Sequence, residues 1–247
     1  MVSENCLKLI REWLNKREIT ARNLKNDWFH GSALVINNLH AEDYLFWSLI
    51  SHPVINQICS HVLNQYSYNN NEGYSLTGSA IRAVYGHQNA QQLHIDSNLP
   101  GCNHILSLQF CIPVDSFTGA SGATQVVIGS QSNLEYPPNN NQLNSKDEAN
   151  LIKLSAEPGD ILVFNAGVWH GSSNKSNTER RAGIFLNYSR WFLKQSFDIA
   201  NNIPDNIYNK LNEDQLRIAG SFYQPPLDSS ENRGRKSSIP IIRHYNP

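Results

Sequence analysis

The chain has 247 residues, of which 40% are hydrophobic and 17% are charged, and its formal net charge is −1. A chain of this length can bury the core of one large domain, so we expect a single domain over 1–247. The near-neutral charge argues against nucleic acid and anionic membrane as partners. With no bilayer-length apolar run and no signal-peptide pattern, we expect a cytoplasmic protein.

The first part of the chain, 1–78, has the apolar spacing of helices. Leu7, Ile10 and Leu14 recur every three or four residues, and a second apolar stripe follows Pro53, a residue favoured at the first position of a helix. These apolar side chains are expected to form core. The sequence therefore predicts a helical N-terminal part.

The pattern changes at about residue 79 to short runs rich in β-branched and aromatic residues, separated by turn sequences with Gly, Pro and Asn. The runs lie at 81–85, 104–114, 124–128, 160–164 and 182–188. Short strands joined by long connecting segments favour a jelly roll, the double-stranded β-helix of cupins, over about 79–190. We expect 132–150 to be an exposed insertion, and 191–247 to hold a helical part and a basic tail.

Three residues, His94, Asp96 and His170, have the pattern of a metal site. His94 and Asp96 flank a single residue, so on a strand both side chains would project to the same face. An HxD pair alone is a weak signal among nine histidines, but His170 follows at the end of the strand-like run that begins at Asp160. Two histidines and one carboxylate form the ligand set typical of non-haem Fe(II) oxygenases. We interpret these three residues as catalytic metal ligands.

A basic pair follows the distal histidine. Arg180 and Arg181 begin an apolar run, so strand alternation would turn one of them inward. A buried guanidinium suits recognition of a carboxylate, and the Ser172 hydroxyl could serve the same ligand or be an ordinary turn serine. The residues alone leave open which arginine faces inward.

Four segments in order resemble the phytanoyl-CoA dioxygenase (PhyH) family: 91–97 (QQLHIDS), 122–131 (GATQVVIGSQ), 157–172 (EPGDILVFNAGVWHGS) and 180–191 (RRAGIFLNYSRW). The resemblance covers roughly 35–220. Members of this family are Fe(II)- and 2-oxoglutarate-dependent oxygenases with a double-stranded β-helix core. The resemblance therefore implies Fe(II) as the metal, 2-oxoglutarate as the co-substrate and O2 as the oxidant.

The resemblance also assigns roles to residues. It implies that His94, Asp96 and His170 bind iron, and that Arg181, eleven residues after His170, binds the far carboxylate of 2-oxoglutarate with help from Ser172. Some members use a glutamine three residues before the first histidine. That position is Gln91 in this chain, although Gln92 is adjacent.

One departure and several open questions remain. The family's loop reads proline-glycine-serine-histidine, whereas this chain has 128–131 (IGSQ), and the histidine lost there is not an iron ligand. The carboxylate of Asp96, absent from related halogenases, favours hydroxylation, with desaturation and ring formation also open. The function expected is oxidation of an unactivated C–H bond in a small-molecule substrate, and neither that substrate nor the oligomeric state is indicated.

Two other classes of function fit the same fold. A cupin-type isomerase or hydrolase would use its metal as a Lewis acid and would not need Arg181. A non-catalytic cupin-like binding protein would not need an intact ligand set. Turnover of 2-oxoglutarate separates both from an oxygenase.

Overall fold

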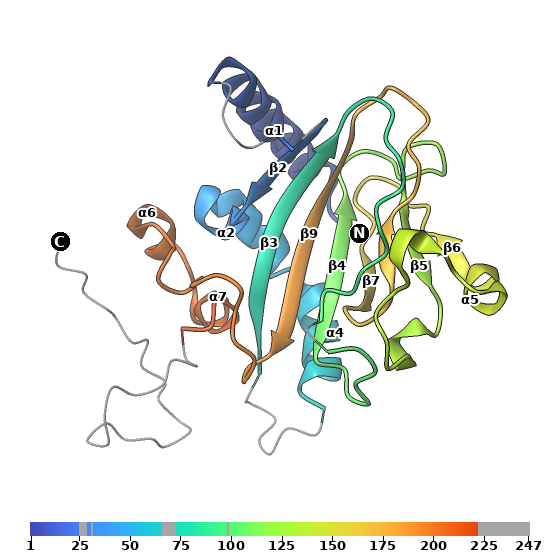
Figure 1. The fold of residues 1–247 in the computed structure, drawn as a ribbon. Coiled ribbons are helices and arrows are strands. Elements are labelled where there is room, and N and C mark those ends of the chain that lie inside the picture. The colour runs from blue at the N-terminus through green and yellow to red at the C-terminus, as the bar shows by residue number, and fades with distance from the viewer. Residues whose placement is uncertain (25–28, 31, 66–72, 98, 222–247) are drawn as a thin grey trace. The chain divides into compact units, whose positions relative to one another are not determined.

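The computed structural model describes residues 1–24, 29–30, 32–65, 73–97 and 99–221 (Figure 1). The expected basic tail lies outside the described residues. The described residues contain nine strands: β1 (Phe29–His30), β2 (Ala33–Asn37), β3 (Tyr74–Val84), β4 (Ser107–Pro113), β5 (Thr124–Val127), β6 (Leu151–Lys153), β7 (Leu162–Asn165), β8 (His170–Ser172) and β9 (Arg181–Arg190).

Helices precede, interrupt and follow these strands. The α-helices are α1 (Glu4–Leu24), α2 (Leu39–Glu42), α3 (Trp47–Ile50), α4 (Pro53–Leu63), α5 (Ser145–Ala149), α6 (Asp205–Tyr208) and α7 (Glu213–Ile218), and the 3-10 helices are η1 (Tyr44–Phe46), η2 (Ser130–Ser132) and η3 (Asn139–Asn141). None of the helices in the described part of the chain is long and apolar enough to cross a membrane.

The strands form two sheets whose order interleaves distant parts of the chain. The larger sheet has the order β1-β2-β3-β9-β4-β7, and the smaller has the order β6-β5-β8. The segment before Asp96 continues the smaller sheet, because Gln88 bridges Lys175 and His94 bridges His170. The jelly roll expected from the sequence is confirmed.

Residues of β4 and β9 are almost all buried, on both faces. Along β9, Arg181 and Phe185 point into a cavity between the sheets, whereas Ala182 and Ile184 alternate with them and are fully buried on the opposite face. The period of two in a strand separates these two sets. One face of the sheet is therefore core and the other carries the cavity.

Helix α1 is anchored at the end of β4, and the residues before it are anchored at the turn that precedes β7. The Arg11 guanidinium donates to the Val114 carbonyl at 3.2 and 2.9 Å, and the Val2 amide donates to Gly159 O at 2.8 Å. Gly159 has φ +89°, and a Cβ there would lie 2.9 Å from Val2 O. Only glycine allows this close approach, so Gly159 is required both for the turn and for its contact with Val2.

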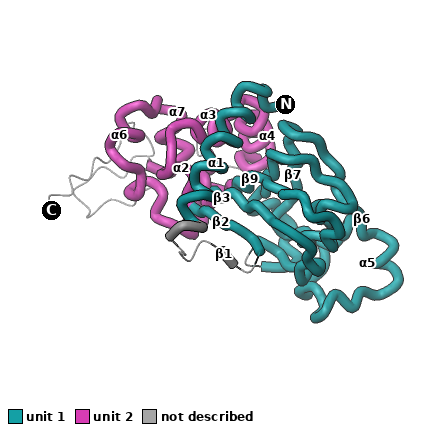
Figure 2. The backbone as a smooth tube through the Cα atoms, turned by 90° about the horizontal axis from the view of Figure 1, so that it is seen from above, with its two compact units in different colours: residues 1–37, 79–187 teal, residues 38–78, 188–247 magenta. Residues whose placement is uncertain are grey.

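The chain divides into two compact units, residues 1–37 with 79–187 and residues 38–78 with 188–247 (Figure 2). The first unit contains α1, the smaller sheet and most of the larger sheet. In the second unit, Tyr188 Oη donates to Ile50 O at 2.7 Å, and Arg190 Nη1 donates to Leu63 O at 2.9 Å. Both contacts hold helical segments against the end of β9.

Three details differ from the sequence-based expectation. Residues 33–37 form β2 and β3 begins at Tyr74, so the N-terminal part is not wholly helical. The HxD pair is not inside a strand, since only His94 makes a β-bridge. The run that ends at His170 is broken by a turn after β7, and His170 instead begins β8 of the smaller sheet.

Candidate functional site

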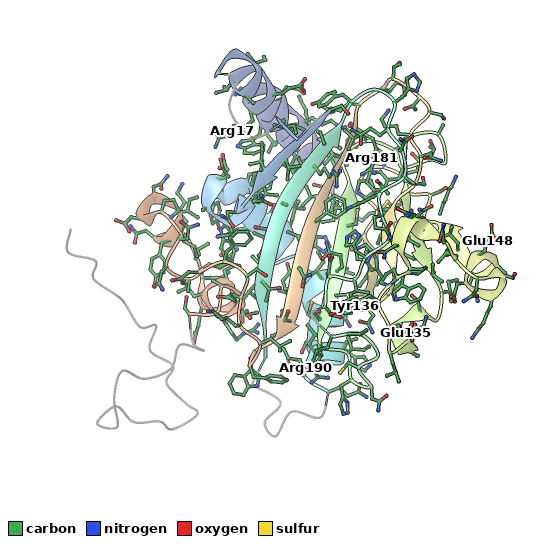
Figure 3. The ribbon with its side chains drawn as sticks, viewed as in Figure 1. Arg17, Glu135, Tyr136, Glu148, Arg181 and Arg190 are labelled. Carbon is green, nitrogen blue, oxygen red and sulfur yellow. The ribbon has the colours of Figure 1, made fainter. Side chains whose placement is uncertain are left out.

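A cavity of about 200 Å³ lies between the two sheets, within the first compact unit. Residues of β3, β4, β5, β7, β8 and β9 and of the segment before β4 line it: Arg82, Gln91, His94, Asp96, Gln109, Thr124, Phe164, His170, Gly171, Ser172, Arg181 and Phe185. Figure 3 labels Arg181, which enters the cavity from the beginning of β9. All six residues singled out from the sequence meet in this one cavity.

His94, Asp96 and His170 form a cluster at the cavity wall. Their ligand atoms all lie within 4.8 Å of one another. Asp96 Oδ1 is 3.7 Å from His94 Nε2, and Asp96 Oδ2 is 3.4 Å from His170 Nε2. Only this group of His, Cys, Asp and Glu in the described part of the chain has the spacing needed to hold a metal ion.

Nδ1 of each histidine, the ring nitrogen that faces away from Asp96, forms a hydrogen bond with a backbone carbonyl. His94 Nδ1 lies 3.1 Å from Gln92 O, and His170 Nδ1 lies 2.9 Å from Val168 O. A carbonyl can only accept, so each Nδ1 carries a proton, and Nε2 of each ring is the nitrogen that faces Asp96 and is placed to bind a metal. This is the tautomer and orientation of metal-binding histidines, and the donor set therefore fits a divalent cation.

Burial and the neighbouring groups lower the pKa values of His94 and Asp96. Burial, followed by the charge of His170, lowers the pKa of His94 below its usual value. Burial raises the pKa of Asp96, but hydrogen bonding and charge from His170 and the charge of His94 more than offset it, so the net pKa is lowered. Both shifts favour the forms that bind a metal, which are a neutral His94 imidazole and an ionised Asp96 carboxylate.

The segment that carries His94 and Asp96 is held against β8 and the turn before it. His94 and His170 exchange two backbone hydrogen bonds of 2.9 Å, and Asp96 N donates to Ala166 O at 2.8 Å. The Phe164 ring lies 4.9 Å from the His170 ring. The extended backbone, and not a regular strand, brings the two ligands to one side.

Arg181 is 2% exposed and lies deep in the cavity. One terminal nitrogen donates to Gly122 O, the guanidinium lies 4.7 Å from the centre of the Phe117 ring, and Nε has no hydrogen-bond partner. Burial lowers the pKa of Arg181 to about 10, with the charge of Arg82 acting in the same direction and Cys111 opposing it. Arg181 remains cationic at neutral pH, and its free Nε fits an anion that enters the cavity.

Arg180 takes a different direction from its neighbour. Its Nε and Nη2 donate to the Asp115 carboxylate at 2.9 and 3.0 Å, and Nη1 donates to Asn15 Oδ1 at 2.8 Å. Arg180, the residue before β9, therefore lies in an ion pair outside the cavity, whereas Arg181, the first residue of β9, lies inside it.

Gln91 and Ser172 lie next to each other in the wall of the cavity. The Ser172 amide lies 3.4 Å from Gln91 Oε1, and both residues line the cavity. Gln92 turns away, and its side chain donates to Pro138 O at 2.9 Å. Of the two adjacent glutamines, Gln91 is the one placed at the site.

Two further polar residues that line the cavity are not predicted from the sequence. Arg82 Nε and Gln109 Oε1 are buried and have no hydrogen-bond partner. Arg82 stands between Ile81 and Ala83, both fully buried, and Gln109 lies in a strand whose every residue is buried. A charged or amide side chain inside an apolar strand is the available signal, because such groups are rarely buried without a polar partner.

Comparison with known proteins gives the family. The model of the phytanoyl-CoA dioxygenase family matches residues 2–182, a range that starts and ends earlier than the resemblance seen in the sequence. The chain is 28% identical over 130 residues to the iron/alpha-ketoglutarate-dependent dioxygenase ausO of Aspergillus calidoustus, covering 49% of this chain and 41% of that protein. It is 25% identical over 144 residues to the dioxygenase olcK of Penicillium canescens, covering 54% and 45%. The chain thus spans just under half of these curated relatives.

Solved structures share the fold at low sequence identity. EctD from S. alaskensis with bound Fe has a TM-score of 0.63 at 15% identity, covering 77% of this chain and 70% of that one. HygX from Streptomyces hygroscopicus with nickel and 2-oxoglutarate bound has a TM-score of 0.57 at 13% identity, covering 78% and 81%. Fold, motif order and family model agree, and the chain belongs to the phytanoyl-CoA dioxygenase family.

Proposed function

We propose that this protein is an Fe(II)- and 2-oxoglutarate-dependent oxygenase that oxidises a C–H bond of a small molecule. The observation that carries the proposal is the pairing, in one cavity, of a two-histidine-one-carboxylate cluster with a buried guanidinium that has a free Nε. A metal-dependent isomerase or hydrolase of the same fold would have no use for that cation. Family membership and the dioxygenase relatives support the oxygenase.

Each of the six residues singled out from the sequence has a role in this proposal. His94 Nε2, His170 Nε2 and Asp96 would hold Fe(II), and Arg181 would bind the far carboxylate of 2-oxoglutarate, with Ser172 and Gln91 beside it. Bound Fe(II) supplies the activation of O2, with one oxygen atom passing to 2-oxoglutarate as it becomes succinate and CO2, and the other to the substrate C–H as hydroxyl.

The chain's own contribution is orientation and exclusion of water. The backbone carbonyls of Gln92 and Val168 fix the imidazole rings, so both Nε2 lone pairs stay directed at one point. Phe164 and Phe185 give the polar cavity an apolar wall. A metal cation held by His94, Asp96 and His170 at one end, and the Arg181 cation at the other, would align a dicarboxylate between them.

The size of the cavity bears on the substrate. Pockets for drug-sized ligands hold roughly 300–1,000 Å³, whereas this cavity holds about 200 Å³. The co-substrate 2-oxoglutarate would fill this cavity, and the substrate whose C–H bond is oxidised would bind at the cavity mouth. Structures of similar fold contain 5-hydroxyectoine and hygromycin B, and we propose that a small molecule is likewise the substrate here, with hydroxylation as the outcome.

Succinate release tests the proposal. The purified chain would be incubated with Fe(II), 2-oxoglutarate and O2, alone and with panels of acyl-CoAs, amino acids and natural-product scaffolds. We expect slow release without substrate and faster release with a true substrate. Conversion of a substrate with Zn(II) and without 2-oxoglutarate would instead support the isomerase or hydrolase.

A further inference from the structure

The insertion between β5 and β6 reaches back to the segment that carries two of the proposed metal ligands. Asn141 lies at the end of η3 in this insertion. Its Oδ1 accepts from Leu93 N at 2.7 Å, and its Nδ2 donates to Gln91 O at 3.1 Å. One carboxamide thus satisfies both backbone groups that flank Gln92.

Those two hydrogen bonds lie on the backbone immediately before His94. Gln91 N donates to Ser172 O, and His94 pairs with His170, so β8 holds one edge of the segment. Asn141 supplies partners for groups that β8 does not reach. The Gln92 carbonyl held between these contacts is also the group that fixes His94 Nδ1.

The conformation of the insertion is consistent with this role. Asn141 has φ +54°, a left-handed conformation that asparagine tolerates better than most residues. The Leu143 amide donates to Asn141 O at 2.9 Å, and Leu143 packs against the cluster of Leu93, Val127 and Trp169. The Gln92 side chain adds a contact to Pro138 O at 2.9 Å. Several contacts therefore fix the Asn141 carboxamide.

We propose that Asn141 is a positioning residue for the metal site, which sets the backbone of 91–93 and through it the His94 ring and the Gln91 side chain. This inference rests on the proposed function for its consequence in turnover, but its first consequence is metal affinity. Removing partners that orient ligating histidines costs roughly 10–100-fold in metal affinity. Because Asn141 acts one step further out, through the backbone, we expect about a tenfold loss.

Asn141→Gly is the variant that isolates the carboxamide, since glycine adopts φ +54° without strain. Asn140→Gly is the matched control, because Asn140 is adjacent, exposed and also left-handed, with φ +56°. Asn141→Asp keeps the acceptor for Leu93 N and loses the donor to Gln91 O. Each variant would be titrated with Co(II), and amide exchange of the peptide that contains 91–96 would be followed without metal.

We expect Asn141→Gly to bind Co(II) about tenfold more weakly than the wild type and its amides at 91–96 to exchange faster. Asn141→Asp should lie between the wild type and Asn141→Gly in both measurements, and Asn140→Gly should match the wild type. The melting temperature of both glycine variants should be similar, which separates positioning from a general loss of stability. Equal Co(II) affinity in Asn141→Gly and Asn140→Gly would overturn the proposal.

The same experiment distinguishes this inference from the proposed function. A wild type that binds no divalent metal would overturn the proposed function, and in that case exchange alone decides the role of Asn141. Unchanged exchange at 91–96 in Asn141→Gly would then show that the carboxamide does not hold the segment. If the wild type binds Co(II), turnover should show a lower kcat for Asn141→Gly at saturating metal and an unchanged kcat for Asn140→Gly.

Discussion

At the scale of single residues, the two adjacent arginines at the start of β9 offer the sharpest contrast. Arg181 is buried with a free Nε in the cavity, whereas Arg180 is paired with Asp115. The same substitution at the two positions therefore separates a ligand-binding cation from a structural ion pair.

Arg181→Ala should weaken 2-oxoglutarate binding by roughly one and a half to several orders of magnitude, because losing the partner of a desolvated charge costs about 2–5 kcal/mol. Arg180→Ala should leave that affinity nearly unchanged and lower stability slightly through the loss of Asp115 as a partner. Calorimetric titration of 2-oxoglutarate into each metal-loaded variant makes the comparison. A larger loss at Arg180 would contradict the assignment of Arg181.

The site residues illustrate what sequence reasoning can and cannot reach. His94, Asp96 and His170 are predicted as ligands from spacing and order, and Arg181 and Gln91 are predicted only through the resemblance to a family. Asn141 could not be found in this way. Its contacts join positions about 50 residues apart, and an asparagine in an Asn-rich stretch gives no signal of its own.

At the scale of elements, β9 packs tightly at Gly183 against Phe117, in the segment that follows β4. A Cβ on Gly183 would lie 2.7 Å from Phe117 Cζ and 3.7 Å from Cys111 Sγ. The Phe117 ring covers the Arg181 guanidinium at 4.7 Å. Glycine at 183 therefore lets the ring pack over the cation.

Gly183→Ala should displace the Phe117 ring, destabilise the protein by about 1–3 kcal/mol through overpacking, and weaken 2-oxoglutarate binding several-fold as the cation–π contact is lost. Gly119→Ala is the matched control, since a Cβ there meets nothing within 4 Å. Urea unfolding and 2-oxoglutarate titration give the two readouts. Unchanged 2-oxoglutarate affinity in Gly183→Ala would show that the ring does not support Arg181.

The short elements were the hardest to predict. The jelly-roll strands β4, β5, β7 and β9 were expected because apolar and β-branched residues repeat between turn sequences. Strand β8, with the sequence HGS, has no such pattern and forms because its backbone pairs with β5 and with the segment before Asp96. Tertiary pairing, which a local pattern does not contain, decides strands of this length.

At the scale of the whole molecule, stability should depend on pH through a histidine far along the chain from the site. His40 is fully buried in the second compact unit, and burial lowers its pKa from 6.5 to about 4. The unfolded chain therefore binds a proton between pH 6.5 and 4 that the folded chain does not. The stabilisation by neutral His40 is present above pH 6.5 and is lost as the pH falls towards 4.

We expect the free energy of unfolding to fall by about 3 kcal/mol between pH 7 and pH 4 from this group alone. His40→Gln should be less stable than the wild type at pH 7 but lose less stability on acidification. Urea unfolding of both proteins at the two pH values tests this. Parallel losses in both proteins would assign the acid sensitivity to other groups.

The central claim is that three residues bind Fe(II) and couple it to 2-oxoglutarate. The most direct measurement is succinate formed per equivalent of protein at a fixed Fe(II) concentration, compared among the wild type, His170→Ala and His87→Ala. His87 is exposed and outside the cavity, so its variant controls for the general loss of a histidine. We predict metal-dependent succinate from the wild type and His87→Ala and none above background from a folded His170→Ala. Succinate formation by His170→Ala at the wild-type rate would contradict the assignment.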